Sequence, residues 1–450
     1  MNAGIAAIKT EAETGLADTY TAARHDLPGG PAVAAARAEA FNIFALGGLP
    51  HRRLEAWKYT DLRRLMKDAK PLAGAPDTAA LAVAEQAGQW LCDLGARRIV
   101  VVNGTFVPAL SDLADLDEGL TIRALAQGLV TDEPLLSADE PLLSADLGTL
   151  LPYNEPALAL NTAFAGDGVV IEVAAGAEVK RPIHLLFVTA GETAAAIFTR
   201  SVAVIGAGAS VSLIESHEGP EGSDYQVNAA LQVQLGDEAR LDHVKIVREG
   251  GAALHVGTLL ADIGARARFN AFGFIVGGSV VRNQMFVRLA GADTVAEISG
   301  VSLLAGRQHA DTTLSIEHAA PGSQSRETFK AVVDEAAHAV FQGKIAVRQQ
   351  AQKTDARMMS RALLLSAEAE VFSKPELEIF ADDVQCGHGA TTGTLDDQLK
   401  FYLMARGIPA KEAEALLIQA FVGEVIDTIA QESLRDALSA ATLAWLGERG

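Results

Sequence analysis

The turns that decide the fold lie between residues 176 and 294, where one four-residue pattern recurs: glycine, then alanine or aspartate, then any residue, then a small or β-branched one. The five copies are Gly176-Ala177-Glu178-Val179, Gly208-Ala209-Ser210-Val211, Gly236-Asp237-Glu238-Ala239, Gly264-Ala265-Arg266-Ala267 and Gly291-Ala292-Asp293-Thr294. Successive glycines are 32, 28, 28 and 27 residues apart, and short β-branched runs fill the intervals from about Leu158 to Leu377. A nearly fixed period of this length, built from strands, predicts stacked units of a parallel β-helix (β-solenoid).

A large antiparallel sandwich is the alternative that the pattern leaves open, because such sandwiches also place a turn about every 8 to 12 residues. We predict a mainly β chain with a parallel β-helix core and a helical region at each end. The predicted division is an N-terminal helical region over residues 1–95, a hairpin and linker or cap over 96–157, the β-helix core over 158–394 and a C-terminal helical domain over 395–450.

Helical spacing of apolar residues is typical of the N-terminal region. One helix is expected over Pro31–Leu46, with Phe41, Phe44 and Ala45 on its apolar face. A second is expected in RRLEAWKYTDLRRL, residues 52–65. Its apolar positions are Leu54, Trp57, Leu62 and Leu65.

The segment from residue 96 to 157 begins with a change to β structure. In Arg97–Pro108 a β-branched run, Asn103-Gly104 and a second apolar run predict a β-hairpin. Residues 132–146 then repeat one heptad, DEPLLSA, in tandem. Its prolines disfavour a continuous helix, so we interpret the repeat as an insertion in a surface loop.

The last 56 residues return to helical spacing. Thr394 is expected to cap a first helix with Asp397 in its first turn, and Gly407 to end it. Pro409 fits the start of a second helix, and a third is expected over Glu432–Trp445. The predicted apolar faces are Leu399, Tyr402 and Leu403 in the first helix, and Ala413, Leu416, Leu417, Ala420, Phe421 and Val425 in the second.

Composition narrows the function classes. The formal net charge of −20 over 450 residues disfavours nucleic acid as a partner. Two cysteines, Cys92 and Cys386, exclude a disulfide scaffold and any site that needs four cysteines of one chain. The sequence has neither a signal-peptide pattern nor an apolar run long enough to span a membrane, so we expect a cytoplasmic protein without a membrane partner.

Cys386 and His388 are the candidate ligands for a metal or cluster. They stand two residues apart in ADDVQCGHGAT (381–391), so in an extended strand their side chains share one face. Thiolate and imidazole suit zinc, iron or an iron-sulfur cluster. Gly387 and Gly389 leave room for a ligand or another backbone. A chance pair in a structural strand is the alternative that this short motif leaves open.

Other chemistries lack support. No P-loop, Gly-x-Ser-x-Gly or His-Glu-x-x-His motif occurs. Asp382-Asp383 and Asp396-Asp397 fit a solvated strand edge and a helix first turn better than acid-base catalysis. Cys92 is expected to be a buried structural thiol. The dispersed histidines, which include His255, His309, His318 and His338, are interpreted as core or surface residues rather than ligands.

Two blocks of sequence resemble a known family. QQAQKTDARMMSRALLLSAEAEVFSKPELEIFADDVQCGHGATTG, followed by LKFYLMARGI, is similar to the C-terminal signature of the SufD branch of the SufB/SufD family, and RRLEAWKYTDLRRL resembles its N-terminal motif. The resemblance covers essentially the whole chain except the duplicated heptad. The paralogous SufB branch carries several additional cysteines and a glutamate in the segment equivalent to GHGAT, which this chain lacks.

The resemblance implies a right-handed parallel β-helix that pairs with SufB, while the C-terminal helices dock the ATPase SufC. It also implies a buried cluster-forming site at the SufB interface, to which Cys386 and His388 would contribute iron or cluster ligands. The isolated chain would then hold no stable cluster, only a transient iron-sulfur cluster shared with SufB. Reduced flavin in such a complex is a further implication without a supporting motif here, and a homodimer of the isolated chain is another.

The function expected from these observations is that of a non-catalytic scaffold in iron-sulfur cluster assembly, with ATP hydrolysis left to SufC. Two alternatives stay open. A pure interaction module would keep the partner contacts without a ligand role for His388. A β-helical carbohydrate-active enzyme would need an acidic or basic catalytic array, which the sequence does not offer in convincing form.

Overall fold

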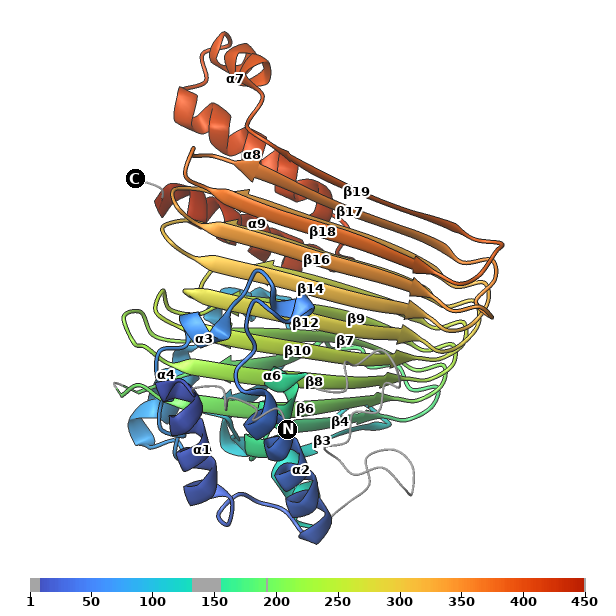
Figure 1. The fold of residues 1–450 in the computed structure, drawn as a ribbon. Coiled ribbons are helices and arrows are strands. Elements are labelled where there is room, and N and C mark those ends of the chain that lie inside the picture. The colour runs from blue at the N-terminus through green and yellow to red at the C-terminus, as the bar shows by residue number, and fades with distance from the viewer. Residues whose placement is uncertain (1–8, 132–154, 192, 449–450) are drawn as a thin grey trace, which may run out of the picture.

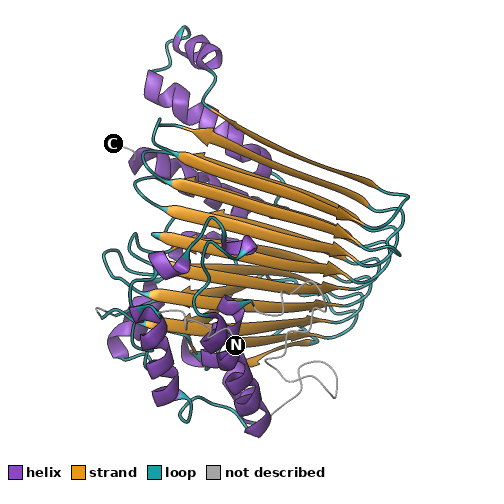
Figure 2. Ribbon diagram, viewed as in Figure 1, coloured by secondary structure: helices purple, strands orange, loops and turns teal. Residues whose placement is uncertain are grey.

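The computed structural model of the chain describes residues 9–131, 155–191 and 193–448. The prediction for the duplicated heptad at 132–146 lies outside these residues. Within them, the strands form two sheets, one of ten strands and one of nine, stacked face to face (Figures 1 and 2). The ten-stranded sheet holds β1 (Arg97–Val102), β2 (Thr105–Phe106), β5 (Ile183–Val188), β7 (Ser210–Glu218), β9 (Arg240–Arg248), β11 (Arg268–Ile275), β13 (Val295–Leu304), β15 (Gln324–Val333), β17 (Asp355–Leu364) and β19 (Gln385–Gly393).

The nine-stranded sheet supplies the other wall. Its strands are β3 (Leu120–Ala124), β4 (Val169–Val173), β6 (Ala196–Ile205), β8 (Gln226–Leu235), β10 (Leu254–Ile263), β12 (Val280–Leu289), β14 (His309–His318), β16 (His338–Val347) and β18 (Glu370–Ile379). From β4 onward the chain alternates between the sheets, and each strand pairs in parallel with the strand two positions later. The predicted parallel β-solenoid is therefore confirmed, and the antiparallel sandwich is wrong.

Most strands are buried on both faces. Inward-facing aliphatic and aromatic side chains, such as Leu241, Phe269 and Ile298, form one continuous core between the sheets. The outer face of the nine-stranded sheet packs against the N-terminal helices, and the outer face of the ten-stranded sheet packs against the C-terminal helices. Burial on two faces explains why the strand sequences read as nearly continuous apolar runs.

The recurring glycines stack where one turn meets the next. An added Cβ would lie 2.6 Å from Ala207 N at Gly236 and 2.0 Å from Ala265 N at Gly291, so these positions need the missing side chain for close approach. In the structure Gly236 is equivalent to Gly206, because each lies four residues before the first residue of the next strand, Arg240 of β9 and Ser210 of β7. Gly208 instead matches Glu238, and both have positive φ. The predicted period is right, but the first two copies are aligned two residues away from their structural equivalents. One structural position, with positive φ, is shared by Gly176, Gly208, Glu238, Arg266 and Asp293.

The N-terminal region supplies the helices α1 (Glu11–Ala23), α2 (Pro31–Gly47), α3 (Leu62–Leu65) and α4 (Thr78–Gln86), with short 3₁₀ turns η1 (Glu55–Trp57) and η2 (Gln89–Leu94). The helix predicted over Pro31–Leu46 is confirmed as α2. The continuous helix predicted over 52–65 is wrong, because only η1 and α3 form there. None of the helices in the described residues combines the length and hydropathy that a bilayer crossing demands.

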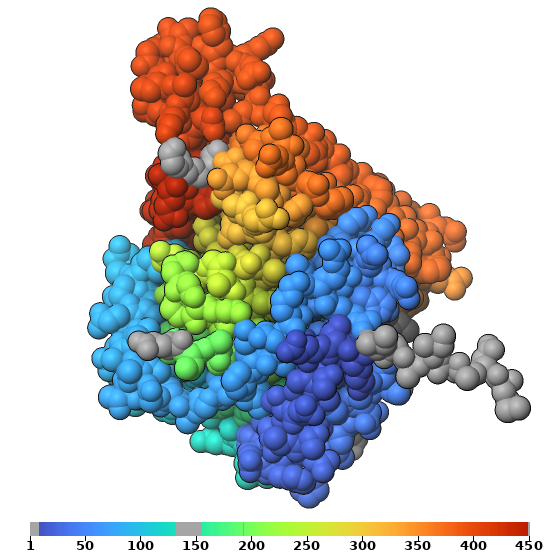
Figure 3. All heavy atoms as spheres, turned by 60° about the vertical axis from the view of Figure 1, so that its left-hand side comes forward, coloured from blue at the N-terminus to red at the C-terminus, as the bar shows by residue number. Residues whose placement is uncertain are grey.

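Residues 54–62 instead lie against the solenoid wall. Arg282 of β12 stacks on the Trp57 ring at 4.1 Å, and its guanidinium donates to Ala56 O at 2.7 Å. Arg282 also forms a fully buried ion pair with Asp311 of β14, to which the Thr60 hydroxyl donates a hydrogen bond. These long-range contacts hold the segment in an irregular conformation that its helical spacing did not predict. In Figure 3 the N-terminal residues, in blue, spread over the lower part of this face.

The segment before the core behaves partly as predicted. Asn103 and Gly104 both have positive φ and join β1 to β2 as an antiparallel hairpin, which confirms the predicted turn. β1 also pairs in parallel with β5, so it belongs to the ten-stranded sheet. After β2 come the 3₁₀ turn η3 (Pro108–Leu110), the helix α5 (Leu125–Val130) and, just before β4, the helix α6 (Pro156–Phe164).

Cys92 is exposed rather than buried. The 3₁₀ turn η2 buries Leu91 and Leu94, which are three residues apart, and this spacing turns Cys92 toward solvent. The prediction of a buried structural thiol is therefore wrong.

The C-terminal region holds α7 (Asp397–Met404), α8 (Ala410–Ile426) and α9 (Glu432–Glu448). The expected Thr394 cap is wrong, because Asp396 accepts from the backbone N–H groups of Gln398 and Leu399. Gly407 has φ of 87° and follows α7 as predicted, and Pro409 precedes α8. The buried face of α8 agrees with the predicted one only at Ala413 and Val425: its other buried residues are Ile418, Val422 and Ile426.

Candidate functional site

The candidate site lies at the C-terminal end of the solenoid, where the stack stops. β18 and β19 are the last strands of their sheets, and among the described residues no strand pairs with their outer edges. Most of their side chains are exposed or half-buried, in contrast to the strands before them. Figure 1 shows this end of the stack with α7 projecting beyond β19.

Cys386 and His388 lie in β19 at this end. Cys386 pairs with Ala356 of β17, and His388 pairs with Met358. Ala356 and Met358 are buried in the core between the sheets, so the two alternate residues of β19 face the same way. The Cys386 side chain is half-buried and packs against this core, whereas His388 is exposed. The pair thus faces the interior of the solenoid in its last turn, which no further turn among the described residues covers.

A hollow of about 690 Å³ adjoins the pair. Its rim and walls come from β15, β17, β19 and α8. The polar and sulfur-bearing residues that line it are Arg326, Glu327, Thr328, Lys330, Arg357, Met358, Met359, Arg361, Gln385, Cys386, His388 and Glu424. Lys330 forms an ion pair with Glu424 of α8, so the hollow lies between the solenoid and the C-terminal helices.

Protonation in this hollow follows from burial. Desolvation raises the pKa of Glu327 to about 7, because its carboxyl group is almost completely buried. Burial also raises the pKa of the Cys386 thiol, an effect that a hydrogen bond from the Ala356 backbone only partly offsets. The thiol therefore stays protonated at neutral pH unless a metal ion or another cation stabilises the thiolate.

The flanking glycines differ. A Cβ added to Gly387 would meet nothing within 4 Å, whereas one added to Gly389 would lie 2.7 Å from Met359 Cε. Gly387 thus leaves open space on the face of β19 opposite to Cys386 and His388, whereas the Met359 side chain already occupies that space at Gly389.

Comparison with known proteins assigns the family. The SufBD core domain, described as SUF system FeS cluster assembly, matches residues 187–421, and the SufBD protein N-terminal region matches residues 10–185. The chain belongs to the SufBD family. The resemblance found in the sequence blocks is thereby confirmed.

Relatives within the SufBD family cover most of the chain. An iron-sulfur cluster assembly SufBD family protein of Synechocystis is 34% identical over 87% of this chain and 86% of its own length. The iron-sulfur cluster assembly protein SufD of Escherichia coli is 30% identical over 89% of both chains. SufD of Bacillus subtilis is 27% identical over 62% of this chain and 64% of its own.

Membership in the SufBD family places the chain in the SUF system. The residues of the hollow limit how many metal or cluster ligands this chain can contribute. One thiol and one imidazole supply two ligands, whereas clusters and tetrahedral metal sites usually take four. The role of Cys386 and His388 as ligands stays a prediction. Their chemistry fits a site that is completed by groups from another chain.

The other histidines named from the sequence do not gather at this hollow. His255 and His318 are fully buried, and His309 and His338 are half-buried. His318 Nε2 lies 2.9 Å from the Ser325 hydroxyl, and His338 forms an ion pair with Glu370, so both have partners elsewhere in the solenoid.

Sequence reasoning missed a second polar cluster inside the SufBD solenoid. Glu215 and His217 of β7 face inward, and Glu215 contacts His217 at 2.6 Å and Lys245 of β9 at 3.0 Å. The signal was present in β7, because Val211, Leu213, Glu215 and His217 occupy alternate, inward positions. Polar residues that continue an apolar alternation indicate a polar pocket inside a sheet stack.

Proposed function

We propose that this chain is a non-catalytic scaffold subunit of the SUF system. It pairs with SufB through the end of its β-solenoid, docks the ATPase SufC through its C-terminal helices, and lends Cys386 and His388 to a cluster-forming site shared with SufB. The iron-sulfur cluster is the transient product of that site, and ATP hydrolysis belongs to SufC. The observation that carries the proposal is the uncovered final turn of the solenoid with Cys386 and His388 on its inward face.

Two exposed strand edges support pairing with another solenoid. The outer edges of β18 and β19 present backbone N–H and C=O groups that no described residue of this chain satisfies by strand pairing. Unpaired edges of this length favour strand addition by another chain. A partner seated there would cover the hollow beside Cys386 and exclude water from it, and its own side chains would supply the missing ligands.

The exposed apolar face of α7 supports docking of a further partner. Leu399, Phe401 and Tyr402 are 51%, 71% and 53% exposed, although the sequence predicts Leu399 and Tyr402 on a face that packs. No residue of α7 is buried. Exposed apolar groups gathered on one projecting helix mark an interaction surface. We assign this surface to SufC.

The shared-site proposal is tested by substituting His388 in the assembled complex. His388→Ala and Cys386→Ser are expected to leave copurification with SufB and SufC unchanged, and to lower the in-cell activity of an iron-sulfur enzyme about tenfold or more, as loss of a ligand would. His25→Ala is the matched control, because His25 is exposed at the opposite end of the chain. Unchanged activity in both variants would favour a pure interaction module.

The isolated chain provides a second test of the same proposal. After anaerobic reconstitution with iron and sulfide, this chain alone is expected to retain no stoichiometric cluster after desalting, as measured by visible absorption and iron content. A stable cluster on the single chain would contradict a shared site, because two ligands would then have sufficed.

The docking proposal is tested at α7. Deleting the residues after Leu395, or making Phe401→Ser with Leu399→Ser, is expected to abolish copurification of SufC while SufB still binds. Leu443→Ser on α9 is the matched control, since Leu443 is 51% exposed but lies on a different helix. Retention of SufC by the α7 variant, or its loss in the control, would place the docking surface elsewhere.

A further inference from the structure

A group of three metal-ligating side chains lies inside the solenoid, away from the hollow at Cys386. His217 comes from the end of β7, Glu249 from the turn after β9, and His255 from the start of β10. One ligating atom of each lies within 4.8 Å of the others. All three are almost completely buried, with exposed fractions of 1%, 3% and 0%. Ligand atoms around one metal ion are about 3 to 4 Å apart, so small side-chain rotations would close the group around an ion.

Two of the three side chains, His255 and Glu249, are incompletely satisfied by the protein. His255 Nδ1 lies 3.0 Å from Glu249 Oε2. Even so, neither ring nitrogen of His255 nor Glu249 Oε2 makes a well-aligned hydrogen bond within the described residues. Buried polar atoms without such partners are costly, and they indicate an unseen ligand or water. Because these atoms belong to imidazole and carboxylate groups, the chemistry they favour is that of a metal ion.

The surroundings of the group resemble a second ligand shell. Glu215 holds His217 Nε2 at 2.6 Å and pairs with Lys245 at 3.0 Å, so Lys245 already has a carboxylate partner. Carboxylate–histidine pairs of this kind orient imidazole ligands in metal sites. The Phe187 ring stacks on His217 at 4.6 Å between centroids and fixes its plane. With Glu215 neutralised by Lys245, the negative charge of Glu249 is left for a bound cation.

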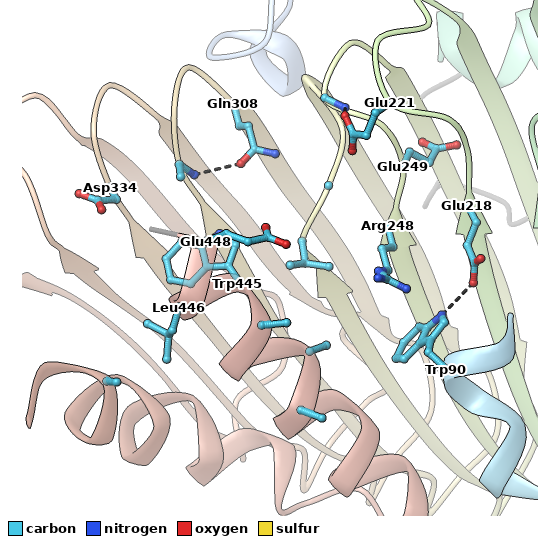
Figure 4. Close-up of a pocket in the computed structure, with 18 of the residues that line it drawn as sticks. Trp90, Glu218, Glu221, Arg248, Glu249, Gln308, Asp334, Trp445, Leu446 and Glu448 are labelled. Carbon is cyan, nitrogen blue, oxygen red and sulfur yellow. Dashed lines mark hydrogen bonds between the residues drawn. The ribbon is translucent and has the colours of Figure 1, made fainter. Parts of the chain in front are cut away.

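An acidic cleft adjoins this group at Glu249. A cleft of about 1160 Å³ lies between the solenoid turns, η2 and α9, and Glu249 forms part of its lining. Seven acidic side chains and two basic ones line it: Glu218, Glu221, Glu249, Asp334, Glu335, Glu414 and Glu448, with Arg248 and Lys411. Figure 4 shows Glu218, Glu221 and Glu249 on one side, near Arg248 and Trp90, with α9 residues on the other. A cleft of predominantly one sign concentrates counter-ions, here cations.

We propose that His217, Glu249 and His255 bind one divalent first-row transition metal ion, such as Fe²⁺ or Zn²⁺, that enters through this cleft. Two imidazoles and one carboxylate form a ligand set that suits these ions and leaves coordination positions for water. His255 is buried, as its interpretation as a core residue expects, and the proposal adds a ligand role. The site is complete within this chain, so it does not depend on the proposed partners.

The test uses Co²⁺ as a spectroscopic probe on the full-length chain after treatment with a chelator. Anaerobic titration is expected to give one bound equivalent with visible d–d bands, and X-ray absorption of the loaded wild type is expected to show nitrogen and oxygen ligands without sulfur. His255→Gln and Glu249→Gln should each weaken Co²⁺ binding about tenfold or more. Competition by Fe²⁺ and Zn²⁺ then ranks the natural candidates.

Two controls separate this site from the others. His318→Gln changes a buried histidine outside the group, and Cys386→Ser with His388→Ala removes the proposed shared site; both are expected to bind Co²⁺ like the wild type. No binding by the wild type would overturn the proposal and leave His217, Glu249 and His255 with a structural role only. Sulfur ligation, or loss of binding in the Cys386 and His388 variant, would overturn it by moving the ion to the end of the solenoid. If the His255 and Glu249 variants fail to fold, the ligand types in the wild type still decide.

Discussion

The solenoid wall beneath residues 54–62 and the final turn at β18 and β19 are built from the same kind of strand, but they meet their surroundings differently. On the wall, Arg282 and Asp311 are fully buried under Trp57 and Thr60. In the final turn, Lys353 and Asp383 form an ion pair whose side chains stay more than 60% exposed. A buried ion pair is costly to break and so holds the chain in one conformation, whereas the charged groups of an exposed pair can still contact a partner. Stability is therefore expected to concentrate on the wall and binding at the end.

The largest expected difference comes from breaking one ion pair in each region. Asp311→Ala leaves Arg282 buried without its carboxylate and should lower the free energy of unfolding by about 3–5 kcal/mol. Asp383→Ala removes an exposed pair and should cause no measurable change. Urea unfolding followed by circular dichroism measures both. Equal losses in the free energy of unfolding of the two variants would mean that burial under residues 54–62 does not make the Arg282–Asp311 ion pair more important than the exposed one.

The pH dependence of stability should show a second, somewhat smaller effect, which arises from the buried His318. Burial lowers the pKa of His318 from 6.5 to about 4, so the unfolded chain binds a proton that the folded chain refuses between these values. The contribution of the His318 burial to the free energy of unfolding is then fully present above about pH 6.5, and it falls by about 3 kcal/mol as the pH drops toward 4. His318→Gln should flatten this part of the profile. A profile that keeps its slope in the His318→Gln variant would contradict the prediction.

The smallest expected difference concerns two glycines. Gly291→Ala places a Cβ 2.0 Å from Ala265 N, so the turns must move apart at a cost of about 1–3 kcal/mol. Gly393→Ala meets no atom within 4 Å at the end of β19, and it should be neutral or stabilise by about 0.4–1 kcal/mol through the unfolded chain. Thermal unfolding of the two variants gives the comparison. A tolerated Gly291→Ala would show that the turns are looser than their spacing indicates.

Much of the fold was predictable because it follows from local, repeated features. Three of the glycine turns, at Gly236, Gly264 and Gly291, require close approach between successive units, and this requirement left its period in the sequence. The copies at Gly176 and Gly208 were aligned two residues away from their structural equivalents. The Asn103-Gly104 hairpin and the helix α2 likewise depend on residues that are near one another in the chain.

The errors share a different origin. Residues 52–65 have helical spacing, but the contacts of Trp57 with Arg282, which is more than 200 residues away, override it. The face of α8 that is buried depends on where the ten-stranded sheet lies, and this cannot be read from α8 alone. Asp396 competes with Thr394 for the same cap, and only backbone geometry decides between them.

The candidate site was predictable to the same limited degree. Cys386 and His388 are two residues apart, so strand geometry alone placed them on one face. The hollow beside them, the raised pKa of Glu327 and the contact with α8 required the stacking of three strands and a helix. In the group of three, His217 comes from the end of β7, whereas Glu249 and His255 come from the connection between β9 and β10 and the start of β10, so no spacing within one strand reveals the group.

The two strand edges at the end of the solenoid also restrict which surfaces can bind there. A single free edge accepts almost any extended peptide, but β18 and β19 end two stacked sheets, whose faces are about 10 Å apart. Only a surface that offers two strands at the same separation can engage both edges at once. The cross-section of the solenoid would therefore favour another solenoid of equal width, whether a paralogue or a second copy, because an isolated strand or a single sheet could pair with only one of the two edges.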